Sequence, residues 1–174
     1  MATKMNLFAG TFSDQDRTYL RRAITLALQA AAEGNLPIGA VIVLDGAIVG
    51  EGYNHVWFPF LAASRHAEME ALRAVDPALW PRAREMTLYT TLEPCLMCTG
   101  AIMLYHVGRL VYGARDNWAG TSGNWQHLPP YFQAVYAAMR WEGPAMPEAC
   151  DELFARVLAC IARRGETVPP EERP

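Results

Sequence analysis

The chain has 174 residues, enough for one domain with a sizeable core and too few for two ordinary ones. Its 52% apolar and 19% charged residues are typical of a globular protein, and no apolar stretch reaches the roughly 20 residues that cross a bilayer. The net charge of −3 provides no basic field to attract phosphates, so composition does not support nucleic-acid binding.

The N-terminus and the cysteines indicate a reducing environment. We expect no secretory signal, because the first apolar run is short and Asp14 and Asp16 follow it closely. Two of the four cysteines form a C-x-x-C, a spacing that indicates metal or redox chemistry more than disulfides. We therefore expect a cytoplasmic protein without a membrane segment.

The first part of the chain predicts a helix followed by a β-hairpin. Ser13 begins the helix with an acidic residue three positions later, and apolar residues then recur at helical spacing until about Gly34. Two strands, 38–44 and 47–53, flank an Asp-Gly turn. An antiparallel pair is therefore expected here.

The rest of the chain alternates between strand and helix patterns. The expected elements are a loop over 54–64, a helix over 66–75, a strand over 86–91, a helix over 95–105, a strand over 109–112, a long loop over 113–130, a short helix from about 130, a strand over 142–145 and a helix over 147–164. The Pro- and Glu-rich tail, 165–174, predicts disorder. This order implies one domain over 1–164, in which helices cover both faces of a mixed sheet of the α/β class.

Two short motifs carry the chemistry: His66-Ala67-Glu68, and Pro94 followed by C-x-x-C at Cys95 and Cys98. Each motif lies where the chain enters a predicted helix, where unpaired N–H groups favour thiolates. The two cysteines, three apart, can grip one ion, and His66 would be a third, neutral ligand. Three protein ligands leave one position of a tetrahedral zinc open, which is typical of a catalytic site.

Glu68 completes the pattern as a proton shuttle rather than a ligand. Residues two apart do not share a helix face, so His66 and Glu68 converge only if His66 stands at the helix entrance. Zinc lowers the pKa of bound water from about 15.7 to about 7, and a neighbouring carboxylate can take its proton and pass it to a leaving amine. The pattern H-x-E…P-C-x-x-C is the signature of zinc-dependent deaminases.

Two other interpretations of the C-x-x-C fit the sequence less well. A closed structural zinc would need a fourth ligand, but Cys150 and Cys160 lie on the apolar stripe of the last predicted helix and more often simply pack there. A thioredoxin-like redox pair would leave His66 and Glu68 without a role. The remaining histidines, His55, His106 and His127, are expected on the surface or in loops.

Beyond these residues, the chain resembles the cytidine/deoxycytidylate deaminase superfamily over roughly residues 15–165, nearest to the tRNA wobble-adenosine deaminases and the bacterial guanine deaminases. The motifs that carry the resemblance are L-P-I-G-A-V-I-V (36–43), G-E-G-Y-N (50–54), H-A-E-M-E-A-L (66–72), T-L-Y-T-T-L-E-P-C-L-M-C-T-G-A-I (87–102) and G-R-L-V-Y-G-A-R-D (108–116). The resemblance implies a three-layer α/β/α sandwich with a five-stranded sheet, the same zinc ligands and acid/base residue, and a homodimer. It also implies that Asn54 hydrogen-bonds the substrate ring and that Asp116 matches a ribose contact of the tRNA enzymes.

Three features differ from the tRNA enzymes. Leu104-Tyr105-His106 stands in place of a polar H-S-R, residues 117–147 match neither group, and the loop after Asn54 is one residue longer and aromatic. Trp57 and Phe58 in that loop are candidate substrate contacts, in a lid that stacks on a flat ring. They could equally meet a dimer partner or a flipped base. Whether loop 54–64 or loop 114–130 forms the lid stays open.

The sequence therefore favours a zinc-dependent hydrolytic deaminase that releases ammonia from a nucleobase, a nucleoside or a related small aromatic heterocycle. A tRNA wobble-adenosine deaminase is the alternative, which the net charge does not favour. A non-catalytic zinc scaffold is a third interpretation. The presence of Glu68 argues against it, because a scaffold needs no carboxylate beside an open coordination position.

Overall fold

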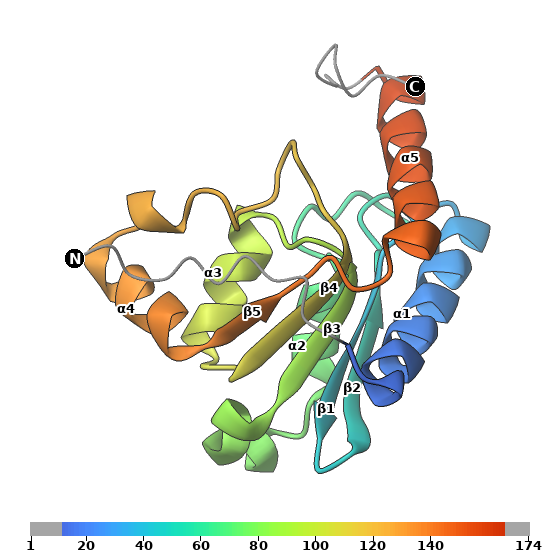
Figure 1. Ribbon diagram of the computed structural model, residues 1–174. Helices are drawn as coiled ribbons and strands as arrows, with labels where there is room; N and C mark the ends of the chain where they lie inside the picture. Colours follow the sequence, from blue (N-terminus) through green and yellow to red (C-terminus); the bar gives the residue numbers. More distant parts are fainter. Residues whose placement is uncertain (1–11, 166–174) are drawn as a thin grey trace.

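A computed structural model of the chain describes residues 12–165 (Figure 1). In chain order the elements are α1 (Asp14–Ala32), β1 (Gly39–Leu44), β2 (Ala47–Tyr53), α2 (Ala67–Ala74), the 3₁₀ helix η1 (Pro77–Glu85), β3 (Thr87–Leu92), α3 (Leu96–Leu104), β4 (Arg109–Ala114), the 3₁₀ helix η2 (Trp125–His127), α4 (Pro130–Ala138), β5 (Arg140–Glu142) and α5 (Pro147–Arg163). The predicted disordered tail, 165–174, lies outside the described residues except for Gly165. Between residues 12 and 165 no helix is long and apolar enough to cross a membrane.

The strands form one five-stranded mixed sheet in the order β2-β1-β3-β4-β5. Strand β1 pairs antiparallel with both β2 and β3, while β4 runs parallel to β3 and β5. The hairpin begins at the predicted Asp-Gly turn, where Asp45 and Gly46 both have positive φ angles of 52° and 78°. The mixed α/β sheet expected from the sequence is confirmed.

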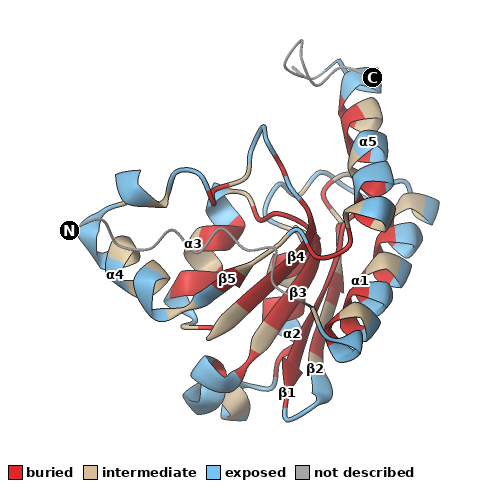
Figure 2. Cartoon of the chain, viewed as in Figure 1, coloured by how far each residue is buried: buried red, intermediate tan, exposed pale blue. Residues whose placement is uncertain are grey.

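Helices cover both faces of this sheet (Figure 1). Helices α1 and α5 pack on one face, and α2 and α3 pack on the other, with α4 beside α3. Strand β1 is buried along its whole length, and β3 and β4 are buried beyond their first residue, whereas α1, α2, α3 and α5 bury only part of their surface (Figure 2). Burial on two faces explains the continuous apolar run of β1, whose six residues are all buried.

Two sequence expectations about secondary structure need correction. The last strand is Arg140–Glu142 and not 142–145, because Pro144 has no N–H to donate to a ladder. The chain still follows β4 after β5, since Ala145 N donates to Tyr112 O and Met146 N donates to Gly113 O. The structure also contains η1, which was not predicted and which starts where Asp76 Oδ1 accepts a hydrogen bond from Ala78 N.

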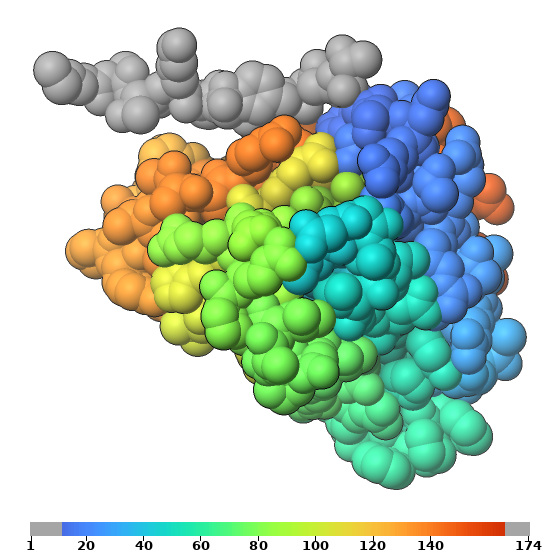
Figure 3. Space-filling view, turned by 90° about the horizontal axis from the view of Figure 1, so that it is seen from below, coloured from blue at the N-terminus to red at the C-terminus, as the bar shows by residue number. Residues whose placement is uncertain are grey.

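Polar contacts tie the hairpin end of the sheet to the segments around it. Tyr19 Oη donates to Gly46 O at 2.7 Å, and Arg82 of η1 donates two hydrogen bonds to Asp45 at 2.8 and 3.0 Å. Figure 3, which views this end, shows the hairpin (cyan) between α1 (blue) and η1 (green). The turn is therefore held from both sides.

A buried ionic network joins α1 to β3 and β4. Asp16 Oδ1 accepts hydrogen bonds from Tyr89 Oη at 2.7 Å and from Arg109 Nη1 at 2.6 Å, and its Oδ2 accepts from Ser13 in the predicted capping box. Burial alone would raise the pKa of Asp16, but the hydrogen bonds from Arg109, Tyr89 and Ser13 outweigh it and hold the pKa well below its usual range. The ionised carboxylate is thus part of the fold.

Replacing Asp16 by Asn is expected to reduce the free energy of unfolding by about 1.5–3 kcal/mol at neutral pH, because Arg109 and Tyr89 lose a charged acceptor while Arg109 keeps Glu142 as a partner. The depressed pKa stabilises the fold above the pKa of an unfolded Asp, about 4, and this contribution disappears as the pH falls toward the lower folded pKa. Urea unfolding at pH 7 and pH 3 should therefore show a smaller difference between variant and wild type at pH 3. An equal difference at both pH values would contradict the role given to the charge.

Candidate active site

The metal-ligand candidates lie at the entrances of two helices on the same face of the sheet. His66 is the N-cap of α2, with φ −73° and ψ 156°, so its side chain precedes the first helical turn. Cys95 is the N-cap of α3, and Cys98 lies in the first turn of that helix. The extended backbone at both caps lets three side chains from separate segments converge.

The donor atoms of these residues have the spacing of a tetrahedral zinc site. His66 Nδ1 lies 3.7 Å from Cys95 Sγ and 3.6 Å from Cys98 Sγ. Tetrahedral zinc with bonds of about 2.0–2.1 Å to nitrogen and about 2.3 Å to sulfur requires a separation of about 3.6 Å. Within residues 12–165, this is the one group of three or more His, Cys, Asp or Glu side chains placed to hold a metal, and it contains no fourth protein ligand.

The electrostatics of the two thiols favour the same conclusion. Hydrogen bonding from Cys98, and then from His66, lowers the pKa of Cys95 to about 4. The adjoining Cys95 sulfur and burial both raise the pKa of Cys98. Two ionised sulfurs this close repel each other, and a divalent cation between them removes that repulsion. The donor set therefore fits zinc.

Glu68 lies beside the ligands without belonging to their group. Its side chain is buried, its Oε2 is 3.5 Å from Cys98 Sγ, and its Oε1 accepts a hydrogen bond of 3.4 Å from Thr90 Oγ1 on β3. Desolvation raises the pKa of Glu68, as the predicted proton shuttle would require. The sequence had assigned no role to Thr90.

Close packing of β2 against α2 brings the end of the hairpin to the same place. A Cβ atom added at Gly52 would lie 2.3 Å from both Ala67 O and Ala71 N, so only glycine allows this approach. Just beyond the strand, His55 N donates to Arg65 O at 2.9 Å. Asn54 and His66 therefore flank one backbone hydrogen bond, although 12 positions separate them in the chain.

Asn54 has a free donor at this position. The residue is fully buried, and its Oδ1 accepts a hydrogen bond from Val56 N at 3.1 Å. Its Nδ2 is buried without any hydrogen-bond partner in the described part of the chain. A buried amide N–H₂ without a partner costs about 1–3 kcal/mol, which a hydrogen bond to a bound ring would recover.

Asp116 begins a loop that meets the start of α3 through an isolated β-bridge between Cys95 and Gly120 and a 2.7 Å hydrogen bond between the Thr99 and Thr121 hydroxyls. Its Oδ1 accepts hydrogen bonds of 2.9 Å from both Trp118 N and Ala119 N, which shapes the loop. Glu93, next to the zinc-binding motif, accepts from Asp116 N at 3.2 Å and from Ser122 N at 2.7 Å. Sequence reasoning missed Glu93, and its place at the carboxyl end of a parallel strand was the available signal. The ribose contact of Asp116 stays a prediction.

The aromatic loop after Asn54 is anchored at its base and exposed at its tip. Asn35 Oδ1, at the end of α1, accepts hydrogen bonds of 2.9 Å from both Trp57 N and Phe58 N. The Trp57 ring lies under the guanidinium of Arg164, 4.3 Å from the ring centroid, while Phe58 is 57% exposed. The substrate contacts of Trp57 and Phe58 stay predictions.

The remaining cysteines and histidines lie outside the ligand group. Cys150 is fully buried in the core, as the packing interpretation requires, and Cys160 is half-buried on α5. The His55 ring lies against Tyr53, with 4.2 Å between ring centroids and a tilt of 36° between the ring planes. None of these residues can close the zinc site.

Comparisons with known proteins agree with this geometry. The family model described as "Cytidine and deoxycytidylate deaminase zinc-binding region" matches residues 13–114. The chain is 43% identical over 117 residues to the chloroplastic tRNA(adenine(34)) deaminase of Arabidopsis thaliana, covering 66% of this chain and 9% of that protein. It is 40% identical over 116 residues to the tRNA-specific adenosine deaminase of Bacillus subtilis, covering 66% of this chain and 71% of that protein.

A solved structure from a study of tRNA:A34 deaminases aligns with a TM-score of 0.64 and 28% identity, covering 79% of this chain and 99% of the other. The chain therefore belongs to the cytidine and deoxycytidylate deaminase family. Together with the three-ligand site, this family membership defines a zinc-dependent hydrolytic deaminase with the expected fold.

Replacing Cys98 by Ser is expected to reduce the zinc content of the purified protein from about one ion per chain to a small fraction, because a thiolate ligand is lost. Replacing Cys160 by Ser is the matched control and should leave the metal content unchanged, since Cys160 lies outside the ligand group. Elemental analysis by mass spectrometry measures both. Stoichiometric zinc in the Cys98→Ser protein would contradict the assignment.

Proposed function

We propose that this deaminase converts adenosine to inosine in the anticodon loop of a transfer RNA. The unpartnered Nδ2 of Asn54 carries the proposal that a flat heterocycle is bound here, because this buried donor needs an acceptor such as a ring nitrogen. The adenosine and the RNA come from the tRNA-specific adenosine deaminases among its relatives. These comparisons support the RNA substrate better than the small free heterocycle that the sequence favours.

The residues of the chain divide the reaction between them. Zinc, when bound to His66, Cys95 and Cys98, supplies the Lewis acidity that activates water toward the amine-bearing ring carbon. Glu68 accepts a proton at one carboxylate oxygen and delivers it to the departing amine, which leaves as ammonia. Thr90 holds the other side of that carboxylate, so Glu68 keeps its orientation during the transfer.

In this proposal, the loops that follow β2 and β4 recognise the substrate. Asn54 orients the ring through its free amide, and Asp116 meets the ribose with the carboxylate oxygen that the loop leaves available. Trp57 and Phe58 lie three and four positions beyond Asn54 and offer faces for stacking. A base lifted from a loop requires less unstacking than one in a duplex, as expected for an anticodon.

A free purine or a related small heterocycle is the second candidate substrate. The net charge of −3 favours it, since RNA binding usually calls for a basic surface. The same zinc, Glu68 and Asn54 would serve both substrates. Only the contacts beyond the reacting ring would differ.

Assays with matched substrates distinguish the two candidates. We expect ammonia and inosine from an anticodon stem-loop with adenosine at the wobble position, and no ammonia when that adenosine is replaced by guanosine. Free adenine, guanine, adenosine, cytosine and small triazines are tested at the same concentration. Faster turnover of a free base than of the stem-loop would contradict the RNA substrate.

The Glu68→Ala protein is the mechanistic control for every active substrate. It should bind zinc like the wild type, because Glu68 is outside the ligand group, yet it should lose at least 10²–10⁴-fold in rate. Retained turnover by a zinc-loaded Glu68→Ala protein would contradict the assigned proton transfer. Rate loss with loss of zinc would instead place Glu68 among the ligands.

We also propose that the protein is a homodimer assembled through α3. This helix contains no charged residue, and its outward side exposes apolar side chains at helical spacing: Leu96 (65%), Met97 (38%) and Leu104 (59%), followed by Tyr105 (40%). A second copy that covers this stripe would remove it from water. We propose a cytoplasmic location as well, because a reducing compartment keeps the zinc-ligand thiols of Cys95 and Cys98 available.

Replacing Leu104 by Glu is expected to weaken the dimer at least tenfold, because the interface would bury a charge. Replacing Leu28 by Glu is the control, since Leu28 is 46% exposed on α1 and lies on the other face of the sheet. Sedimentation velocity over a range of concentrations measures both. A wild type that stays monomeric, or a Leu104→Glu protein that dimerises like wild type, would contradict this interface.

A further inference from the structure

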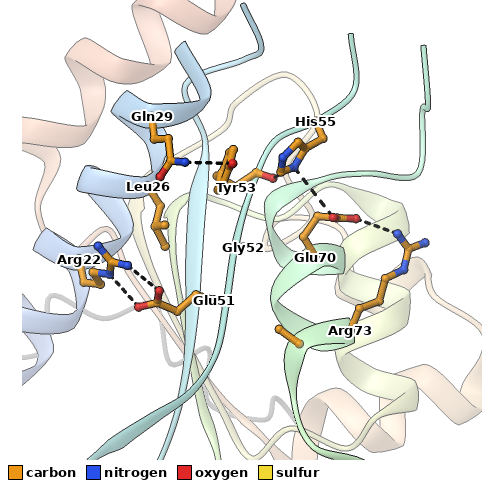
Figure 4. Close-up of a pocket in the computed structure, with 10 residues that line it drawn as sticks. Arg22, Leu26, Gln29, Glu51, Gly52, Tyr53, His55, Glu70 and Arg73 are labelled. Atoms are coloured by element: carbon orange, nitrogen blue, oxygen red, sulfur yellow. Dashed lines mark hydrogen bonds and ion pairs between the residues drawn. The ribbon is translucent and has the colours of Figure 1, made fainter. Parts of the chain in front are cut away.

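Two surface cavities of about 500 Å³ each differ in how their charges are compensated. The first lies between α1, β2 and α2, and Figure 4 shows its charged side chains paired across it. Arg22 donates to Glu51 at 2.7 and 2.6 Å, and Glu70 accepts from Arg73 at 2.7 Å. Because its acids and bases neutralise each other, this cavity offers no net attraction to an ion.

The second cavity, here called the Arg–Trp pocket, lies between the C-terminal ends of α1 and α5. Its lining includes Arg156, Arg163 and Arg164 together with Trp57, Asn35 and Cys160, and it includes no acidic residue. None of the three arginines has an ion pair with any residue between 12 and 165. Three uncompensated guanidinium groups thus line one hollow on an otherwise acidic protein.

Contacts inside the pocket fix its shape while leaving the charges available. The Arg164 guanidinium lies over the Trp57 ring at 4.3 Å, a cation–π contact that positions a donor fork without neutralising it. Arg163 Nη2 is 2.9 Å from Cys160 Sγ. An anion that entered this cavity would meet guanidinium donors without a competing carboxylate among the lining residues.

Hydrogen bonds connect the Arg–Trp pocket to the loop that follows Asn54. Asn35, which lines the pocket and is only 3% exposed, accepts hydrogen bonds from Trp57 N and Phe58 N at 2.9 Å each. The same loop starts at Asn54, and its tip exposes Phe58 (57%), Phe60 (64%) and Leu61 (74%). A basic hollow beside exposed aromatic side chains is the usual arrangement for single-stranded nucleic acid.

We propose that the Arg–Trp pocket binds backbone phosphates of the RNA substrate next to the nucleotide being deaminated. This inference rests on the proposed function and extends it, since the pocket would contribute affinity through phosphate contacts while Asn54 and Glu68 act on the base. Phosphates at this position place the neighbouring bases against the exposed aromatic tip of the loop. The localised charge would also give a chain of net charge −3 one place at which to attract RNA.

RNA binding by the zinc-loaded Glu68→Ala protein tests the pocket without turnover. Adding Arg156→Gln and Arg163→Gln is expected to weaken binding of a fluorescent anticodon stem-loop about tenfold, because each exposed arginine gives a charge-assisted contact. The dependence of log K on log[salt] should become shallower by about 1 for each arginine removed. Fluorescence anisotropy at several salt concentrations measures both quantities.

Arg21→Gln together with Arg84→Gln is the control, because it removes the same charge from exposed arginines on α1 and η1 that line neither cavity. Equal weakening in the two double variants would overturn the pocket and leave only an effect of net charge. Unchanged binding in the Arg156→Gln/Arg163→Gln protein would overturn it too. If the protein with Glu68 intact makes no inosine in the stem-loop, the proposed function itself fails, and the RNA assignment of the pocket falls with it.

Discussion

The convergence of two helix N-termini on one point is the constraint on which the rest of the site depends. His66 and Cys95 both occupy N-cap positions, with extended backbone, so each side chain precedes its helix and can reach the other. Unpaired N–H groups at both ends favour the negatively charged sulfurs and carboxylate gathered there. The sheet aligns the two helices, because each follows a strand of the same β-sheet and packs on the same face.

Glycine residues in β1 and β2 set how closely these strands approach the helices that pack on them. Gly50 and Gly52 of β2 lie against the backbone of α2, where an added Cβ would come within 2.5 Å of a carbonyl oxygen. Gly39 of β1 meets α1 in the same way on the opposite face, with Ala23 O at 2.1 Å from its added Cβ. The hairpin is thus clamped between two helices, and its far end delivers Asn54 to the catalytic centre with little freedom to move.

Much of this arrangement could be predicted from local patterns, and the remainder depends on contacts between distant segments. The capping box at Ser13, the Asp-Gly turn and the spacing of His66, Glu68, Cys95 and Cys98 are signals carried by a few residues each. Strand β5 has only three residues, too few for a period to appear, and Pro144 sits beyond it rather than inside it. Glu93 accepts its hydrogen bonds from backbone N–H groups more than 20 positions away in the chain. The residue type alone does not predict such contacts. Likewise, the stacking of Trp57 under Arg164 exists only because α5 returns to the end of α1.

The hydrogen bond between His55 N and Arg65 O closes the loop at its stem, and a second, between Ala62 N and Val56 O, closes it again further out. The segment beyond these two hydrogen bonds, 57–61, can therefore change in length or sequence without displacing the side-chain amide of Asn54 or the imidazole of His66. Substrate choice and bond-breaking chemistry thereby become separable, and a single scaffold can exchange its recognition segment during evolution while its reactive centre stays fixed.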